Sequence, residues 1–588
     1  MIKLLDSISK KVEQAFLDCG YDSQYGRVSI SNRPDLCEYQ CNGAMACGKI
    51  YHKPPFQIAD EVQERLAKEP IFQKVESVKP GFLNINLEPE FLSEYLKDME
   101  NDERLGCDKV DKPRTIIIDY GGPNVAKPLH IGHLRSAIIG ESIKRIQQFM
   151  GHQVLGDVHI GDWGLQMGLI ITELKKRKPE LVYFDENYSG EYPSCAPFTL
   201  SELEEIYPFA SAYAKEHLEY KEEAMKATVF IQQGNAGYRA LLNQILAVSI
   251  ADLKKNYENL NVSFELWLGE SDAQPYIPEM MEKLIQDGHA YESDGALVID
   301  VKQDSDSKEM PPCLIRKGDG AALYATTDLA TLVQRMEDYQ PDKVLYVVDK
   351  RQDMHFTQVF RAAKKTGIVP KEVDLKFLGF GTMNGKDGKP FKTRSGGVMR
   401  LEHLLAEINE EMYQKIVGNH EVEENEARAT AKIVGLAAVK YGDLSNQASK
   451  DYIFDMERFT SFEGNTGPYL LYTIVRIKSI LAKYALTSKD IKGNVLLPAR
   501  SESEKGLMKM LALFNASMEI ASNEDAPHKI CAYIYELANA FNHFYHETKI
   551  LTEEDLSRQG SYIRLLELTK RVMETCIDVL GFQAPDRM

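Results

Sequence analysis

The spacing of apolar residues predicts a parallel sheet near the middle of the chain. The β-branched run at 115–118 breaks at the glycines and proline of 121–123, and a helical pattern then continues until Gly151. A second apolar segment, 153–159, again ends in glycines and an acid at 161–164. A strand, a helix and a strand in this order form a βαβ crossover, whose two strands are parallel. Ligands are expected at the carboxyl edge of such a sheet.

The sheet is expected to continue after a long insertion. The apolar run 343–349 is typical of a buried strand, a helix should follow from about 355 to 365, and 375–381 should form the next strand. Between the two halves of the sheet, roughly 170–300, apolar residues recur at helical spacing over 203–260. The insertion is therefore expected to be mostly helical.

The two ends of the chain have different patterns. Residues 1 to about 110 combine an amphipathic opening helix, a helix around 57–68 and a strand at 81–87 with alternating apolar residues. From about 426 the pattern is helical throughout, which predicts a helical bundle. The expected helices are 427–441, 466–484, 504–522, 527–545 and 561–580.

Composition narrows the class of protein. With 588 residues, 44% of them apolar, and no apolar run long enough for a membrane span, the chain is expected to be a soluble protein of several domains. Acidic residues near the N-terminus argue against a signal or transit peptide, which favours the cytoplasm. The nine cysteines are scattered, and the closest group, Cys37, Cys41 and Cys47, lacks the paired spacing of a zinc site. They are expected to be reduced, with no zinc bound.

The net charge of −18 bears on the choice of partner. An acidic surface repels RNA, so composition alone favours an enzyme that acts on small molecules. If RNA binds, the charge must be unevenly distributed.

Two histidines lie in the turn that follows the first sheet strand. His130 and His133 are three residues apart, with Gly132 between them, at the point where the helix should begin. This spacing places both rings near one face, beside free backbone N–H groups and the positive end of the helix dipole, which suits a phosphate. Lys127 could add a positive charge. Because neither a Walker loop nor a G-x-G-x-x-G motif occurs here, a tight turn with surface histidines explains the spacing equally well.

The residues around this turn resemble those of a known enzyme family. His-Ile-Gly-His at 130–133, preceded by Pro-Asn-Val-Ala-Lys-Pro at 123–128, is similar to the adenylate-forming signature of class I aminoacyl-tRNA synthetases. The longer pattern from Pro123 to Ser136 resembles the arginyl-tRNA synthetases specifically. Further stretches agree, so the resemblance covers essentially the whole chain.

The resemblance implies an α/β fold with a defined domain order. A Rossmann-like parallel-sheet catalytic domain is expected at 111–400, with the helical insertion near 170–300. An N-terminal α+β added domain at 1–110 would contact the tRNA elbow, where the family has a segment related to 31–39. A helical connector would occupy 401–455. An all-α anticodon-binding bundle is expected at 456–588. The insertion does not look like a β-rich editing domain. This fits arginine as the substrate, because a site that pairs every donor of a guanidinium should reject smaller amino acids without editing.

The resemblance also implies an arginine site. In the family a tyrosine and an aspartate four residues apart hold the substrate side chain, which implies Tyr324 and Asp328 here. A guanidinium is always protonated and offers five planar donors, so it needs an ionised carboxylate and a flat neighbour, whereas lysine is a compact point charge. From the sequence alone, Asp328 is more simply an N-cap, worth about 1 kcal/mol to a helix. Asp119, Asn124 and Gln352 match further positions that hold the amino acid, and the charge of Asp119 suits the α-ammonium group.

A second charged segment is implied to bind ATP. Residues 385–397 contain four glycines and four cations, a composition that is usually solvated surface. Their place after the last sheet strand matches the second class I signature, a lysine-rich loop that closes on the triphosphate. Lys-Pro-Phe-Lys-Thr at 389–393 departs from the common Lys-Met-Ser-Lys-Ser, as many arginyl enzymes do, and Lys127 is expected to supply part of the missing charge. The residues implied to bind ATP are Gly132, His130, His133, Lys389, Lys392 and Arg394, of which His130, His133 and Lys392, together with Lys127, are expected to be catalytic.

The C-terminal helices are implied to bind the anticodon. Segments 464–480 and 580–588 resemble the anticodon-binding domain of the family. Aromatic residues on such helices are more often core, but unpaired bases need stacking surfaces, so Tyr469, Tyr472 and Arg476 are candidates.

The resemblance therefore implies an arginine–tRNA ligase that uses ATP with Mg²⁺ and binds no membrane. The family habit makes a monomer the expectation. Rival interpretations are a class I synthetase for another amino acid, a small nucleotidyltransferase that shares the His-x-Gly-His turn, and a catalytically silent RNA-binding relative.

Overall fold

The computed structural model describes residues 1–316, 323–389, 399–419, 423–487 and 495–588. The chain divides into two compact units. Unit 1 contains residues 1–109, 461–579 and 583–588, and unit 2 contains 110–460 and 580–582. We describe each unit by itself.

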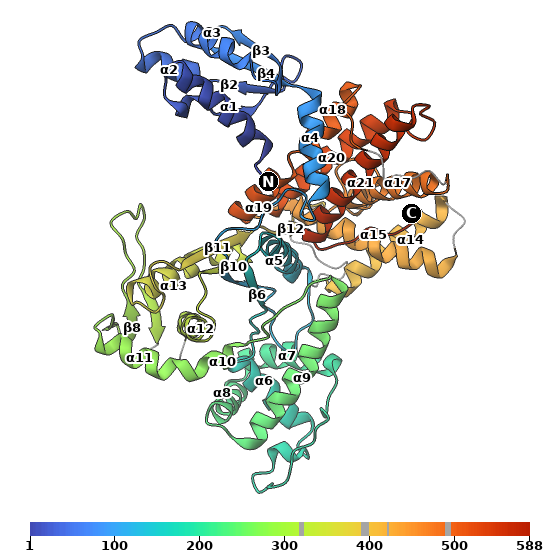
Figure 1. Ribbon diagram of the computed structural model, residues 1–588. Coiled ribbons are helices and arrows are strands. Elements are labelled where there is room, and N and C mark those ends of the chain that lie inside the picture. The colour runs from blue at the N-terminus through green and yellow to red at the C-terminus, as the bar shows by residue number, and fades with distance from the viewer. Residues whose placement is uncertain (317–322, 390–398, 420–422, 488–494) are drawn as a thin grey trace. The chain divides into compact units, whose positions relative to one another are not determined.

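Unit 2 is built on a four-stranded sheet with the order β11-β10-β5-β6. All three neighbouring pairs are parallel, so the predicted crossover from β5 to β6 is confirmed. The strands are β5 (Thr115–Tyr120), β6 (Gln153–Asp157), β10 (Lys343–Asp349) and β11 (Asp374–Phe380). The helices that connect them are α5 (Ile131–Phe149), α12 (Tyr324–Asp338) and α13 (Asp353–Lys365). The predicted α/β fold is therefore confirmed in this part of the chain (Figure 1).

Helix α5 lies directly against the sheet. A Cβ atom added at Gly140 would meet the side chain of Tyr120 at 2.2 Å, so only glycine allows the helix to approach β5 this closely. The ring of Tyr120 is buried, and its hydroxyl donates to Glu141 at 2.9 Å and to the carbonyl of Ser263 at 2.8 Å. This packing fixes the start of α5 above the carboxyl edge of the sheet.

The insertion is helical, as predicted, except at its end. Its helices are α6 (Leu165–Arg177), α7 (Leu200–Glu216), α8 (Leu218–Gln232), α9 (Ala236–Asn259), α10 (Glu270–Ala273) and α11 (Ile277–Gln286). A small antiparallel sheet follows, made of β7 (Ala290–Ser293), β8 (Ala296–Ile299) and β9 (Cys313–Arg316). The sequence did not predict this sheet because each of its strands is only four residues long.

Unit 2 continues through helices α14 (Leu401–Asn419), α15 (Glu424–Leu444) and α16 (Met456–Phe459). Two short parallel strands, β12 (Met383–Asn384) and β13 (Tyr452–Ile453), join the residues after β11 to those after α15. This pairing leads the chain from the sheet into the lysine-rich segment.

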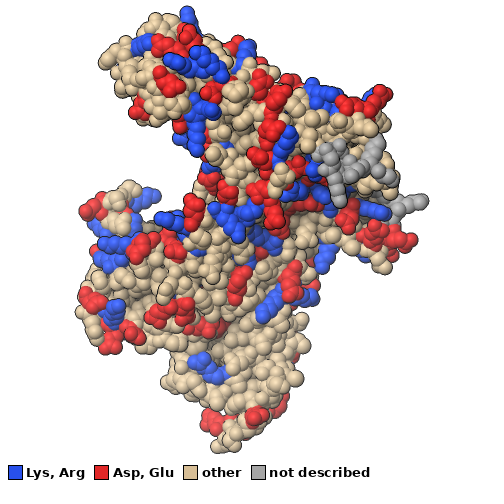
Figure 2. All heavy atoms as spheres, viewed as in Figure 1, with Lys and Arg blue, Asp and Glu red and all other residues tan. Residues whose placement is uncertain are grey.

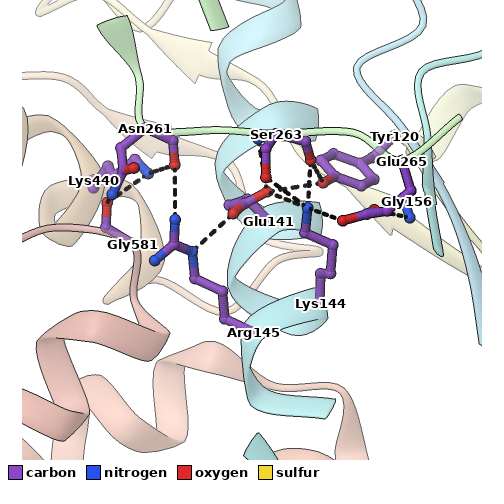
Figure 3. Close-up of polar contacts among 10 residues, drawn as sticks. All are labelled: Tyr120, Glu141, Lys144, Arg145, Gly156, Asn261, Ser263, Glu265, Lys440 and Gly581. Carbon is purple, nitrogen blue, oxygen red and sulfur yellow. Dashed lines mark hydrogen bonds and ion pairs between the residues drawn. The ribbon is translucent and has the colours of Figure 1, made fainter. Parts of the chain in front are cut away.

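A buried charge network ties α5 to its surroundings (Figure 3). The carboxylate of Glu141 accepts from Nε of Arg145 at 2.8 Å and lies 3.2 Å from Nζ of Lys144. Lys144 in turn contacts Ser263 and lies 3.3 Å from Glu265. Helix α5 is thereby bonded to the segment that returns from the insertion to the sheet.

The same network reaches a fully buried lysine. Nζ of Lys440 donates to the carbonyls of Asn261 at 3.1 Å and Gly581 at 2.8 Å, and Nη2 of Arg145 donates to that of Asn261 at 3.3 Å. Burial lowers the pKa of Lys440 to about 7. Two carbonyl acceptors and the nearby charge of Glu141 offset part of the cost of burying the amine.

We predict that Glu141→Ala destabilises unit 2 by about 3 kcal/mol, because it leaves Lys144 and Arg145 partly buried without their shared carboxylate. The midpoint of chemical unfolding, followed by circular dichroism, should move to lower denaturant. Glu424→Ala is the matched control: it removes an exposed carboxylate 2.9 Å from Arg428, and such a surface pair contributes at most about 1 kcal/mol. Equal shifts for the two variants would contradict the role given to Glu141.

Unit 1 contains an antiparallel sheet with the order β1-β2-β4-β3. Its strands are β1 (Val28–Ile30), β2 (Tyr39–Cys41), β3 (Phe72–Val78) and β4 (Phe82–Leu87). Helices α1 (Leu4–Asp18), α2 (Gly43–Ile50), α3 (Pro55–Leu66) and α4 (Pro89–Asn101) accompany it. The predicted opening helix and the strand before α4 are both present.

The other part of unit 1 is helical, as predicted. Its helices are α17 (Gly467–Ala485), α18 (Glu502–Leu511), α19 (Phe514–Glu524), α20 (Pro527–Glu547) and α21 (Leu556–Val579). The prediction of a single helix at 504–522 was wrong, because α18 ends at Leu511 and α19 begins at Phe514. Both residues are fully buried, so packing rather than a glycine or proline sets the break.

Within the described ranges, no helix has both the length and the apolar character needed to cross a bilayer.

Candidate active site

The two histidines of the turn form the start of α5. His130 is the N-cap residue, His133 occupies the third helical position, and their ring centroids lie 3.9 Å apart. Nδ1 of His130 accepts from the backbone N–H of Gly132 at 3.0 Å, and Nδ1 of His133 accepts from that of His130 at 3.2 Å. The two side chains therefore cap the helix themselves, and the rings do share one face.

This arrangement corrects the expectation of free backbone N–H groups at the turn. The N–H of Gly132 and of His133 are bonded within the turn, and that of Ile131 donates to the carbonyl of Met399 at 3.2 Å. The groups left to meet a phosphate are the Nε2 atoms of the rings. Because Nδ1 accepts a hydrogen bond in each ring, the neutral form of each histidine carries its proton on Nε2 and can donate from there.

Both rings are neutral at physiological pH. Burial lowers the pKa of His133 to about 3, with further lowering by His130 and Lys127. The pKa of His130 is lowered for the same reasons, burial first and Lys127 second. The histidines therefore offer directed donors rather than positive charge.

The described residues that follow the lysine-rich segment lie next to this turn. The N–H of Ile131 donates to Met399, and the N–H of Leu401 donates to the carbonyl of Leu129 at 2.9 Å. Residues 399–401 thus pair with 129–131. Lys389 is exposed, whereas Lys392 and Arg394 lie outside the described residues.

The other flank of that segment is held by Arg135, two residues after His133. Its Nε donates to Oδ1 of Asp443 at 2.7 Å, and its Nη1 donates to the carbonyls of Gly381 at 2.6 Å and Lys450 at 3.0 Å. Gly381 directly follows β11, so both flanks of the predicted ATP loop are bonded to the first turns of α5.

Lys127 faces the insertion rather than open solvent. Its Nζ lies 4.4 Å from the centroid of the Tyr207 ring on α7, a cation–π distance. The positive charge is thereby kept beside the two histidines.

Asp328 lies in the second turn of α12 and is not an N-cap, so the simpler interpretation of this residue was wrong. The N-cap position is Leu323, and the side chain of Thr326 accepts from its backbone N–H at 3.2 Å. Oδ2 of Asp328 contacts Nε2 of His355 on α13 at 2.5 Å. Tyr324, one turn earlier, is 76% exposed, so its ring is available to a ligand.

Asp119 is paired inside the protein. It stands opposite Asp157 on the neighbouring strand, and Nη2 of Arg335 lies 2.6 Å from Oδ2 of each carboxylate. Asp119, Asp157 and His159 are close enough together to hold a metal ion, but the guanidinium already supplies a positive charge between the two carboxylates. Burial raises the pKa of Asp119, and Arg335 opposes that rise.

The remaining predicted arginine ligands lie at the same edge of the sheet. Asn124 follows β5 and bridges to Gly161, which follows β6. Gln352 ends the short turn after β10 and directly precedes α13. Both residues therefore follow strands at the carboxyl edge of the sheet, where ligands of parallel sheets bind.

Glu270 was missed by the sequence reasoning. It begins α10, after a segment in which Gly269 bridges to Ile160 beyond the end of β6. Its pKa is raised to about 7, chiefly by burial and also by the charges of Asp162 and Asp328, whereas His159 opposes the rise. The available signal was the apolar run 266–268 that precedes it, which continues the sheet edge inside the insertion.

Comparison with known proteins assigns this chain to a family. Residues 96–456 match the family described as "tRNA synthetases class I (R), catalytic domain", 470–588 match "DALR anticodon binding domain", and 3–87 match "Arginyl tRNA synthetase N terminal domain". An arginine–tRNA ligase of Agathobacter rectalis is 64% identical, and one of Alkaliphilus oremlandii is 54% identical, each over 100% of both chains. The chain belongs to the arginyl-tRNA synthetase family. The crystal structure of the arginyl-tRNA synthetase from Plasmodium falciparum has the same fold, with a TM-score of 0.81, 24% identity and coverage of 100% of both chains.

The residues predicted to contact the anticodon in this arginyl-tRNA synthetase family member form one cluster in unit 1. Nη1 of Arg476 on α17 donates to Oδ1 of Asn542 on α20 at 2.7 Å, and its guanidinium lies over the rings of Tyr472 at 4.7 Å and Tyr545 at 5.2 Å. Tyr469 is bonded to Asn542 at 2.9 Å. Asn542 and Tyr545 were not predicted, although their spacing on one helix face is a readable signal.

Net charge does not locate an RNA surface on this synthetase. Figure 2 shows Lys and Arg interspersed with Asp and Glu over the face drawn, with few charged side chains where the helices α7–α9 of the insertion lie. An RNA contact must therefore be sought in local clusters such as that around Arg476.

Proposed function

We propose that the chain ligates arginine to its tRNA in two steps. The α-carboxylate of arginine attacks the α-phosphate of ATP, which gives arginyl-adenylate and pyrophosphate. The 2′-hydroxyl of the tRNA's terminal adenosine then accepts the arginyl group and AMP leaves, as class I membership implies. The observation that carries this proposal is the position of the His130–His133 turn, which begins α5 directly after β5, the strand that carries Asp119 near its carboxyl end. A charging assay tests it: labelled arginine should become attached to tRNA, and labelled lysine and citrulline should not.

The activation step needs positioning more than proton transfer. The Nε2–H groups of His130 and His133 donate to phosphate oxygens, and both donors are fixed before ATP arrives. Mg²⁺ enters with ATP on its phosphates. Lys127, Lys389, Lys392 and Arg394 supply the positive charge that the neutral histidines lack.

Arginine is recognised at both ends. Asp119 binds the α-ammonium group, and Asn124 and Gln352 complete that end of the pocket. Asp328 accepts from the guanidinium, and the exposed ring of Tyr324 provides a flat neighbour. Glu270 adds a second carboxyl near Asp328.

The pKa of about 7 for Glu270 leads to a pH prediction. Its carboxyl is neutral below pH 7 and ionised above it, and only the ionised form attracts a guanidinium. The KM for arginine should therefore rise about fivefold as the pH falls from 8 to 6, while the KM for ATP changes less.

The control for this prediction is Glu270→Gln, which cannot titrate. Its KM for arginine should be high at every pH, so the profile becomes flat. A Glu270→Gln enzyme that keeps the wild-type pH dependence would rule out Glu270 as its source.

The tRNA is bound at two further places. Residues 1–110 contact the elbow, and residues 456–588 contact the anticodon through Tyr472, Arg476 and Tyr545. Tyr469 acts by holding Asn542. A guanidinium already stacked between two rings is suited to a splayed-out base.

We predict that Arg476→Ala raises the KM for tRNA about tenfold and leaves the KM for arginine unchanged, since one stacking contact is worth about 1–3 kcal/mol. Steady-state charging kinetics measure both constants. Lys483→Ala is the control, because it removes an exposed cation from the same helix. If both variants raise the KM for tRNA equally, the effect comes from the loss of positive charge on the helix, and the cluster around Arg476 has no specific role.

A further inference from the structure

Arg335 connects the two ends of the proposed arginine pocket. It belongs to α12, the helix that carries Tyr324 and Asp328, and its guanidinium reaches Asp119 of β5 and Asp157 of β6. Its side chain is 0% exposed. The guanidinium also lies 5.2 Å from the centroid of the Tyr346 ring on β10, so it is enclosed by three neighbouring strands.

Two facing carboxylates in this position need a cation. Asp119 and Asp157 stand opposite each other in adjacent parallel strands, and Asp157 is fully buried. Like charges at short range in a buried place favour protonation of one of them. Arg335 opposes the rise in the pKa of Asp119 that burial causes, and its guanidinium cannot lose its own proton.

Among the described residues, the charged and titratable groups around Asp119 are Arg335 from α12, Asp157 from β6, Tyr346 from β10 and His159 just beyond β6. Nδ1 of His159 lies 4.0 Å from Asp157. Of these, Asp157 disfavours a charge on Asp119, while Arg335 and a protonated His159 favour it.

We propose that Arg335 is a positioning residue for the substrate's α-ammonium group: it keeps Asp119 ionised and engages Oδ2, so that Oδ1 is presented to the ligand. The inference rests on the proposed role of Asp119. Arg335 does not touch the substrate, and its effect on the reaction passes through Asp119. Asp157 is the second carboxylate that fixes the guanidinium in place.

The test compares two ligands that differ only at the α-ammonium group. Arginine carries this group, and 5-guanidinopentanoate lacks it. Both are measured in pyrophosphate exchange with tRNA present, as the KM of arginine and the inhibition constant of the analogue, between about pH 6.5 and 8.5. The ratio of the KM of arginine to the inhibition constant of the analogue isolates the α-ammonium contact, since Asp328 and Glu270 act on the guanidinium that both ligands share.

In Arg335→Met, the KM of arginine should rise about tenfold or more, and the inhibition constant of the analogue should stay within about twofold. The ratio should fall as the pH rises, because Asp119 then regains its charge. Adding Asp157→Asn to Arg335→Met removes the opposing carboxylate and should recover part of the loss. Arg335→Lys retains a cation and should keep the wild-type pH profile of the ratio.

The possible results separate this inference from the role of Asp119. If Asp119→Asn leaves the ratio unchanged, the proposed role of Asp119 is wrong. If Asp119→Asn raises the ratio but Arg335→Met does not, or if Arg335→Met weakens the binding of both ligands equally, the positioning role is overturned. Should Arg335→Met not fold, the double variant, which has one buried carboxylate fewer, carries the same comparison, and an unchanged ratio there overturns the proposal.

Discussion

Replacing Asp328 by asparagine is expected to lower kcat/KM for arginine about 1,000-fold. The substrate guanidinium keeps its charge at any working pH, so loss of the carboxylate leaves a cation in the pocket without its partner. Asparagine preserves the volume and one acceptor oxygen, and the contact of this side chain with His355 at 2.5 Å can persist in altered form. The loss should therefore report the charge rather than a disturbed fold. Steady-state charging kinetics measure it.

The same variant should also lose discrimination. Citrulline has the shape of arginine without the charge, and we expect the wild-type enzyme to reject it because Asp328 would then lack a cationic partner. Asp328→Asn should narrow the preference for arginine over citrulline. Glu337→Gln, an exposed acid on the same helix, is the control and should behave as wild type. If Asp328→Asn keeps the wild-type preference for arginine over citrulline, the Asp328 carboxylate does not recognise the guanidinium.

Replacing His130 by alanine is expected to lower the rate of adenylate formation about 100- to 1,000-fold. The ring offers a fixed Nε2–H donor to the phosphates, and loss of one such donor in a preorganised site has an effect of this size. The KM for arginine should change little, because the proposed amino-acid pocket is formed by other side chains. Single-turnover pyrophosphate release measures the chemical step directly.

Loss of the helix cap is a separate consequence of this change. The N-cap contact of His130 is worth about 1 kcal/mol, which should appear in unfolding experiments. Gly132→Ala is a second variant at this turn, since its Cβ would meet Nδ1 of His130 at 2.8 Å and displace the ring without removing it. We expect this variant to lose activity as well. Full activity in either variant would exclude His130 from the reaction.

The sheet could be predicted from the sequence because its signals are local. The β-branched run before Gly121 and the helical pattern that ends at Gly151 define a crossover, and parallel pairing follows from it. The three short strands at 290–316 could not be predicted, since four residues carry too little periodicity. The end of α18 at Leu511 has no local sequence signal either, because it depends on how the helices of the bundle pack.

Residues of the candidate active site could be identified from the sequence only where they belong to a sequence motif. The His-Ile-Gly-His motif located the turn, but the use of its amides by the histidines themselves depends on the cap geometry. The pairing of Arg335 with Asp119 joins residues 216 apart in the chain, so no spacing rule indicates it. Glu270 was not predicted as a site residue because it lies in the segment that was interpreted as a helical insertion. Each of these depends on tertiary contacts that a single sequence does not encode locally.

Pyrophosphate exchange with ATP tests the central claim most directly. It is run with arginine, lysine, glutamate and cysteine in turn, each with and without total tRNA. The account predicts exchange with arginine alone among the four, and only when tRNA is present, since the family generally needs bound tRNA to activate arginine. Exchange with another amino acid would contradict the assignment of Asp328 and its neighbours, and no exchange under any condition would contradict the proposed activity itself.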